Sequence, residues 1–208
     1  MMSGSLRSVR RLVDAPFYYV HRMVNSNALQ SAHAALPNSS YIDNLITIQE
    51  KIKTTVVYPF TETKNKPALN SELSGYITMV GDCGVKGIDT FLKIAELMPE
   101  HQFRVVGRSF SRQQKNNVLY LPFFKNVTDM YSTTKLLLVP SVWREAFGKV
   151  SIEASSHAIP TIVSNRGGLP ETVCDEQLIV DDYLNPEKWK ESIENVLRNG
   201  SEWGGECK

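Results

Sequence analysis

The stretch from Lys135 to Ala154 reads KLLLVPSVWREAFGKVSIEA and contains the pattern that decides the fold. Residues 136–139 form a short apolar run, which is typical of a strand buried on both faces of a parallel sheet. A proline and a polar loop follow, and residues 149–157 then predict a helix. A buried strand that leads through a loop into a helix is the repeating unit of an α/β sheet.

The same alternation continues along the chain from Tyr76 onward. It predicts a doubly wound α/β fold, a Rossmann-like parallel sheet covered by helices. The predicted strands are 76–80, 102–106, 118–121, 135–139, 161–163 and 178–180. The predicted helices are 88–98, 127–132, 149–157 and 186–198, with a short turn at 169–173.

The segment before this unit is less regular. It predicts a helix at 45–53, a short strand at 54–58 and a polar connection at 59–74, with a further strand at 31–36. We divide the chain into residues 1–40 and a domain of residues 41–208. Near the N-terminus, Asp14 and Pro16 interrupt the apolar stretch that follows three arginines, so we predict no signal peptide and no transmembrane segment.

The composition narrows the classes of partner. The chain has 208 residues with 23 Lys and Arg against 22 Asp and Glu, and its net charge of +1 gives no reason to expect nucleic acid as a main partner. Three cysteines at wide, irregular spacings predict neither a disulfide framework nor a zinc site with paired ligands. No acidic pair has the character of metal ligands, so we predict no bound metal. We take the cytoplasm as the default location of the protein.

Ligands of an open α/β sheet bind beyond the carboxyl ends of its strands, where loops lead into helices. If a helix starts near Gly148, its free amides make an anion site suitable for a phosphate. Glu153 then lies one turn into the helix, where it can accept two hydrogen bonds from a vicinal diol such as a ribose, and Glu145 lies in the loop. The alternative is that Glu153 pairs with Lys149 or His157 at helical spacing, and this stretch alone leaves both open.

Three other turns are candidates for anion binding. Residues 81–87 read GDCGVKG between a strand and a helix, which suits a pyrophosphate, with Lys86 as a point charge. Residues 165–171 read NRGGLPE, and Gly167 and Gly168 can present amides to an anion, although a tight loop capped by its own side chains explains them equally well. Gly107 and Arg108 follow the second predicted strand.

These turns, in this order, resemble the donor-binding C-terminal half of the GT-B glycosyltransferases, most closely family 4 (group 1), which are retaining and metal-independent. The match covers roughly residues 41–200. The resemblance implies that Glu145 contacts the donor sugar and its phosphate region, that Glu153 holds the ribose hydroxyls, and that Lys86 neutralises the diphosphate. We therefore predict Glu145 and Lys86 as catalytic residues. The predicted donor-binding residues are Glu153, Gly148, Phe147, Lys86, Arg108, Gly167 and Gly168.

Two departures from the family pattern stand out. Asp82 follows Gly81 where these enzymes usually have an arginine, so one diphosphate contact is missing or comes from Arg108 or Arg144. The chain also resembles only the second of two domains, which implies that residues 1–40 are a remnant of an N-terminal acceptor domain or a flexible segment. A separate N-terminal domain or subunit is therefore an expected partner.

These features predict a glycosyltransferase of the hexosyltransferase type that uses a nucleotide sugar as substrate and needs no cofactor. One alternative is a non-catalytic nucleotide-sugar-binding half or subunit of a split enzyme. Another is an epimerase or phosphorylase of the same fold, since fold does not dictate function. An oxidoreductase is disfavoured because no Gly-x-Gly-x-x-Gly opens a helix.

Overall fold

The computed structural model describes residues 28–29, 31–50, 52–61 and 75–199. The chain divides into two compact units, of which the first ends at Tyr58 and the second starts at Pro59. Of the predicted connection at 59–74, residues 62–74 lie outside the described residues, as do residues 1–27 and 30 of the predicted segment 1–40.

The first unit contains the helix α2, Ser40–Glu50. The prediction of a helix at 45–53 was wrong in its bounds, because the Oγ atom of Ser39 accepts a hydrogen bond from the amide of Ile42 at 3.1 Å and starts the helix earlier. The strands predicted at 31–36 and 54–58 were also wrong. Within the described residues they form one isolated parallel bridge, between Ala35 and Thr54.

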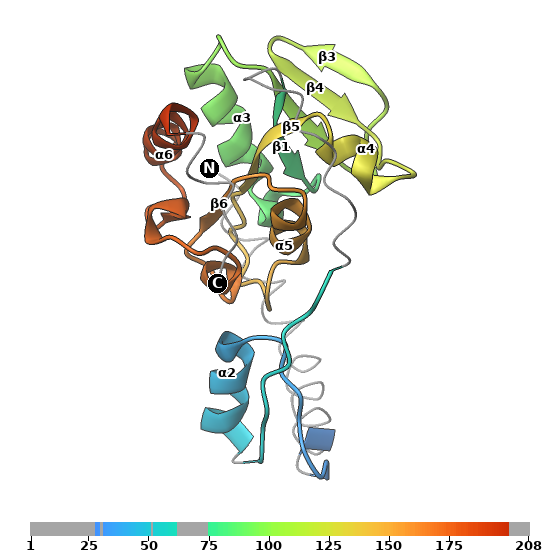
Figure 1. Cartoon of the computed structure of the whole chain (residues 1–208), viewed down its shortest axis with the longest axis vertical. Coiled ribbons are helices and arrows are strands. Elements are labelled where there is room, and N and C mark those ends of the chain that lie inside the picture. The colour runs from blue at the N-terminus through green and yellow to red at the C-terminus, as the bar shows by residue number, and fades with distance from the viewer. Residues whose placement is uncertain (1–27, 30, 51, 62–74, 200–208) are drawn as a thin grey trace, which may run out of the picture. The chain divides into compact units, whose positions relative to one another are not determined.

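The second unit is a seven-stranded sheet in the order β3-β4-β2-β1-β5-β6-β7, with helices packed against it (Figure 1). Every pair of neighbouring strands is parallel except β3 and β4, which are antiparallel. This confirms the predicted α/β fold. The strands are β1 (Tyr76–Val80), β2 (Phe103–Val106), β3 (Gln113–Lys115), β4 (Val118–Leu121), β5 (Thr134–Val139), β6 (Thr161–Ser164) and β7 (Ile179–Val180).

The strand β3 was not predicted, and its composition explains why. All three of its residues are exposed, so it has none of the apolar alternation from which strands are recognised. The chain turns from β3 into β4 at Asn116, which has a positive φ of 53°. Asparagine tolerates this left-handed conformation better than most residues, which favours the hairpin.

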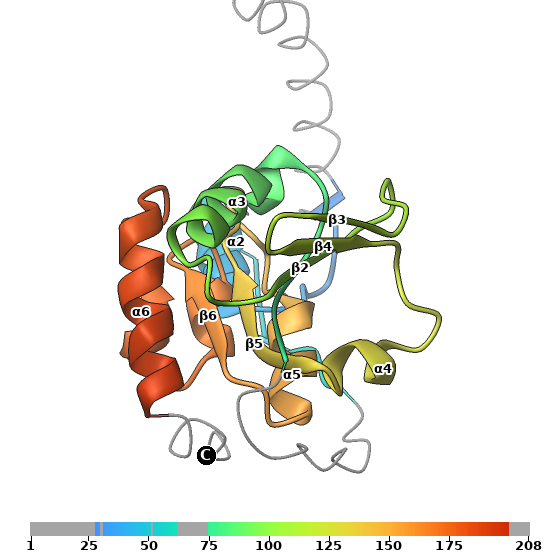
Figure 2. The same ribbon diagram turned by 90° about the horizontal axis from the view of Figure 1, so that it is seen from above.

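Helices cover both faces of the sheet, with α3 and α6 on one face and α4 and α5 on the other (Figure 2). The four helices predicted in this unit are confirmed to within one residue at each end. They are α3 (Ile88–Leu97), α4 (Val127–Tyr131), α5 (Lys149–Ser156) and α6 (Pro186–Arg198). Short 3-10 helices lie at η1 (Gly84–Lys86), η2 (Leu169–Thr172) and η3 (Glu176–Leu178).

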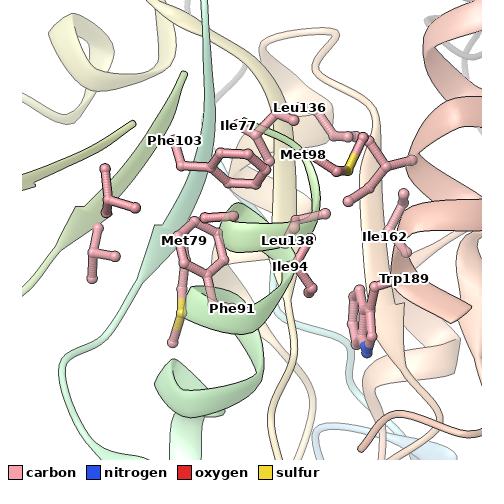
Figure 3. Packing of buried hydrophobic residues seen from close by; sticks show 14 of the residues in the cluster. Ile77, Met79, Phe91, Ile94, Met98, Phe103, Leu136, Leu138, Ile162 and Trp189 are labelled. Atoms are coloured by element: carbon pink, nitrogen blue, oxygen red, sulfur yellow. The ribbon is translucent and has the colours of Figure 1, made fainter. Parts of the chain in front are cut away.

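The larger core lies on the face covered by α3 and α6 (Figure 3). Phe91 of α3 meets Phe103 of β2 edge to face, with 5.5 Å between ring centroids. Trp189 of α6 is fully buried, and its Nε1 donates to the main-chain oxygen of Tyr183 at 3.0 Å, so its polar atom is satisfied. The first contact holds α3 against β2, and the second joins α6 to the loop that precedes it.

The opposite face holds a buried arginine, Arg104 of β2. Its guanidinium donates to the hydroxyls of three threonines and to the main-chain oxygen of Met130, at 2.6–3.0 Å. The rings of Tyr76 and Phe124 lie 4.9 and 5.5 Å from its Cζ atom. Among the described residues no carboxylate forms an ion pair with it, and burial lowers the pKa of Arg104 to about 10. The hydrogen bonds and the two aromatic rings therefore stabilise the positive charge of Arg104 in place of a carboxylate. The three threonines are Thr78, Thr133 and Thr134.

We expect Arg104→Met to lower the free energy of unfolding by about 2–4 kcal/mol, because the variant removes a hydrogen-bonded buried group that joins β1, β2, β5 and the end of α4. Urea denaturation followed by circular dichroism measures the change. The matched control is Arg198→Met at the exposed end of α6, which we expect to cost less than about 0.5 kcal/mol. Equal effects of the two variants would contradict a stabilising role for Arg104.

None of the described helices is long and apolar enough to cross a membrane. Cys83, in the loop after β1, is a free and exposed thiol. Cys174 is disulfide-bonded, which the spacing of the three cysteines did not predict.

Candidate functional site

The site is built from loops that follow the carboxyl ends of β1, β5 and β6. The strands β1 and β5 are neighbours in the sheet, whereas the chain continues from β1 to β2 on one side and from β5 to β6 on the other. This reversal is the topological switch point at which open α/β sheets bind ligands. The loops that flank it are residues 81–87 and residues 140–148.

Main-chain contacts hold these two loops together. The carbonyl oxygen of Val85 accepts hydrogen bonds from the amides of Val142 and Trp143, both at 3.0 Å, and lies 3.1 Å from the Oγ of Ser141. Gly87 ends the first loop with a φ of 85°, and a Cβ atom there would overlap the carbonyl oxygen of Pro140. Glycine is therefore required at position 87 by the approach of two backbones.

The side chains of Lys86 and Glu145 meet across these two loops, so the two residues can belong to one site. The Nζ atom of Lys86 lies 2.6 Å from Oε1 of Glu145, with the two side chains 42% and 16% exposed. The Oγ of Ser141 lies 2.8 Å from the same carboxylate oxygen. The sequence analysis missed Ser141, whose only local signal is its place directly after the strand and proline. A diphosphate at Lys86 has to share the ammonium group with Glu145.

The third loop contacts the main chain of Glu145. Glu145 and Gly167 form a parallel bridge, and the amide of Gly168 donates to the carbonyl oxygen of Glu145 at 2.8 Å. Gly167 has a φ of 64°, and a Cβ atom there would overlap that carbonyl oxygen. The structure thus gives both glycines a role in bringing loops together, and anion binding by them stays a prediction. Arg166 adds a further link, since its Nε donates to the carbonyl oxygen of Val142 at 3.1 Å.

The helix α5 starts at the position that the sequence predicted. Gly148 is its N-cap with a φ of 126° and supplies no side-chain cap. In the first turn the amide of Ser151 donates to the carbonyl oxygen of Gly148 at 3.0 Å, so an anion at this end of the helix has to be met by the amides of Lys149 and Val150. A Cβ atom at Gly148 would lie 2.6 Å from Cδ2 of Leu169. The side chain of Phe147 is buried, so any contact from this residue to a ligand has to come from its main chain.

Glu153 lies on α5 beside a pocket of about 350 Å³ whose lining includes Thr128, Tyr131 and His157. Its Oε2 accepts a hydrogen bond from the hydroxyl of Tyr131 at 3.1 Å, and its Oε1 lies 3.5 Å from Nζ of Lys149. Lys149 is 71% exposed and Glu153 22% exposed, so this ion pair contributes little and leaves the carboxylate open to the pocket. His157 contacts the main-chain oxygen of Glu153 and not its carboxylate.

Asp82 holds the neighbouring loop after β2. Its Oδ2 accepts hydrogen bonds from the amide and the hydroxyl of Ser109, at 2.7 and 2.5 Å. These bonds lower the pKa of Asp82. Asp82, which stands where the resemblance expects an arginine, thus stabilises the loop of residues 107–109 through these hydrogen bonds. Arg108 and Arg144 are both exposed, and a diphosphate contact from either stays a prediction.

Within the described parts of the chain, no group of three His, Cys, Asp or Glu side chains is placed to hold a metal ion. Lys86, Glu145 and the positive end of α5 are among the charges that lie at the switch point. This arrangement can bind an anion, and Glu153 can bind hydroxyl groups beyond it.

Comparison with known proteins identifies related chains. A family model described as Glycosyl transferases group 1 matches residues 60–203. Spore coat protein SA of Bacillus subtilis (strain 168) is 32% identical over 88 residues, 40% of this chain and 23% of that protein. An uncharacterized 41.2 kDa protein from the cps region of Klebsiella pneumoniae is 32% identical over 98 residues, 43% of this chain and 27% of that protein. The match thus spans about a quarter of the length of these curated relatives.

Solved structures show a likeness of fold. Sucrose-phosphate synthase from Thermosynechococcus elongatus aligns with a TM-score of 0.73 at 21% identity, over 88% of this chain and 53% of that one. HepE of Anabaena in complex with UDP and glucose aligns with a TM-score of 0.71 at 17% identity, over 88% of this chain and 58% of that one. The present chain therefore spans little more than half of these proteins.

We expect Gly87→Ala to lower the free energy of unfolding by about 2 kcal/mol or more, because the new Cβ overlaps the Pro140 carbonyl in a left-handed backbone conformation. Thermal unfolding measures the loss. Gly84→Ala in the same loop is the control, since its Cβ meets only Oδ2 of Asp89 at 3.8 Å. If both variants unfold at the same temperature, the close approach of the two loops is not what requires glycine.

Proposed function

Because this chain belongs to the glycosyl transferases group 1 family, we propose that it is the donor-binding part of a retaining, family 4 glycosyltransferase of the hexosyltransferase type. It moves a sugar from a nucleoside-diphosphate sugar to an acceptor hydroxyl. The observation that carries the proposal is the contact of Lys86 with Glu145 at the switch point of the sheet, beside the N-terminus of α5.

The charges of the site suit a diphosphate that leaves with the donor nucleotide. Lys86 and the amides of the first turn of α5 stabilise the negative charge that develops on the leaving group. This stabilisation does not require a metal ion. The contacts of Glu145 with Lys86 and Ser141 fix its carboxylate, so that it meets the donor sugar in one orientation. Glu153 holds the ribose hydroxyls. The donor is a substrate, and the proposal includes no cofactor.

The likeness to solved structures supports the choice of ligand. HepE of Anabaena has been crystallised with UDP-glucose and with UDP, and its chain aligns with 88% of this one. The present chain spans little more than half of such proteins. We include in the proposal a partner, which is an N-terminal acceptor domain or subunit. A location in the cytoplasm also stays a prediction.

Titration of the protein with UDP, ADP and GDP in a calorimeter tests donor recognition. We expect one of these nucleotides to bind, and Lys86→Gln to weaken its binding about tenfold or more while leaving the weaker binding of the matching nucleoside unchanged, because Lys86 faces the diphosphate. Lys93→Gln, on the exposed side of α3, is the control and should change neither affinity. If no nucleotide binds, or if Lys86→Gln weakens nucleoside and diphosphate equally, the donor site is not the one proposed.

A second candidate is a half-enzyme that binds the donor and turns over nothing alone. Incubation of the bound nucleotide sugar with and without acceptor alcohols separates the two. Transfer that depends on an acceptor supports the transferase, whereas binding without transfer or donor hydrolysis supports the binding half. A changed sugar nucleotide formed without any acceptor indicates an epimerase.

A further inference from the structure

Tyr131, at the end of α4, contacts both Glu153 and His157. Its hydroxyl lies 3.1 Å from Oε2 of Glu153 and 3.4 Å from the main-chain oxygen of Val150, and its single proton goes to the nearer acceptor, the carboxylate. Its ring stacks on His157 with 4.8 Å between centroids and 30° between planes. His157 in turn lies 2.9 Å from the main-chain oxygen of Glu153 through Nδ1. The hydroxyl of Ser156 lies 3.2 Å from the same nitrogen. Each of the three residues Tyr131, Glu153 and His157 therefore contacts the other two.

This set leaves the carboxylate of Glu153 with two positions for a ligand. A carboxylate has about four lone-pair sites on its two oxygens. Tyr131 occupies a site on Oε2, and Lys149 faces Oε1 at 3.5 Å. One site on each oxygen remains, which is the number that two neighbouring hydroxyl groups require.

Tyr131 is the rigid member of the set, and Lys149 is not. Tyr131 is 1% exposed and His157 is 4% exposed, so neither can turn without disturbing the packing of α4 against α5. Lys149 is 71% exposed and is free to leave. Burial, and next the negative charge of Glu153, raise the pKa of Tyr131, so its hydroxyl stays protonated and remains a donor. The orientation of the carboxylate is therefore set by Tyr131.

We propose that Tyr131 is the positioning residue that orients Glu153 toward the 2′- and 3′-hydroxyls of a ribose, and that the site thereby selects ribonucleoside over 2′-deoxyribonucleoside diphosphate sugars. The inference rests on the proposed function. A deoxyribose offers one hydroxyl to a carboxylate that is held in place for two. One acceptor site then stays buried against the pocket without a donor, which costs affinity.

The test compares UDP, ADP and GDP with their 2′-deoxy counterparts by calorimetry, using the base that binds most tightly. We expect the wild-type protein to prefer the ribonucleotide about tenfold, the usual size of one hydrogen bond to a charged group. In Tyr131→Phe this ratio should fall to about two or less, mainly because the ribonucleotide binds more weakly. The ring and its stack on His157 are kept, so the variant is expected to fold.

Two further variants separate positioning from stability. Tyr120→Phe removes the hydroxyl of another buried tyrosine, on β4, and should leave the ratio unchanged. Glu153→Gln should reduce the ratio as Tyr131→Phe does, and the double variant should reduce it no further, because both act through the same carboxylate. The ratio compares two ligands on one sample, so partial unfolding lowers both apparent affinities and does not change it.

The outcomes are distinct. A folded Tyr131→Phe that keeps the wild-type ratio overturns the proposal and leaves Tyr131 a packing residue, and so does an unchanged ratio in Glu153→Gln. Equal affinity of the wild-type protein for the ribonucleotide and the 2′-deoxyribonucleotide overturns the proposal, while the proposed function stands. Absence of binding by every nucleotide overturns the proposed function, and the inference with it.

Discussion

The contact on which the site depends is the one made by the carbonyl oxygen of Val85. It accepts from two amides of the loop after β5 and lies within reach of the hydroxyl of Ser141, so it joins the loops after β1 and β5. Lys86 follows Val85 in one loop, and Glu145 follows Ser141 in the other. Their 2.6 Å contact is a consequence of this backbone pairing and of the sheet order that makes β1 and β5 neighbours.

Glycines make such close contacts possible. At Gly87 and Gly167 a side chain would overlap a carbonyl oxygen of the neighbouring loop, and both residues have a positive φ. A glycine-rich turn at a strand end suggests a cradle for phosphate, yet in this protein the same glycines first serve to join three loops. Rigid joining matters for binding as well, because a preorganised site loses less entropy when a ligand enters.

The two carboxylates of the site have different surroundings and therefore different uses. Glu145 is held by a cation and lies near a serine hydroxyl, while Glu153 is held by a buried phenol and a mobile lysine. The surroundings of Glu145 suit contact with a charged group of a ligand, and those of Glu153 leave lone pairs for neutral hydroxyls. Arg104, unlike Lys86, is a buried cation, and there threonine hydroxyls and aromatic rings take the place of a carboxylate.

The sequence by itself determined the elements whose signals are local. Buried apolar runs predicted β1 and β4 to the residue, the helical pattern of residues 186–198 predicted α6, and the glycine turns pointed to Lys86, Glu145 and Glu153. The tertiary structure alone decided the roles of Tyr131 and Arg104, because their partners lie 22 and 26–30 residues away in the chain. It also placed Ser141 beside Val85, 56 residues away, whereas Glu145 lies only four residues from Ser141. It also decided β3, whose exposed residues pair through the main chain and carry no hydrophobic pattern. Hydrogen bonds between distant segments form only once the sheet has set the segments side by side, so no local pattern of residues encodes them.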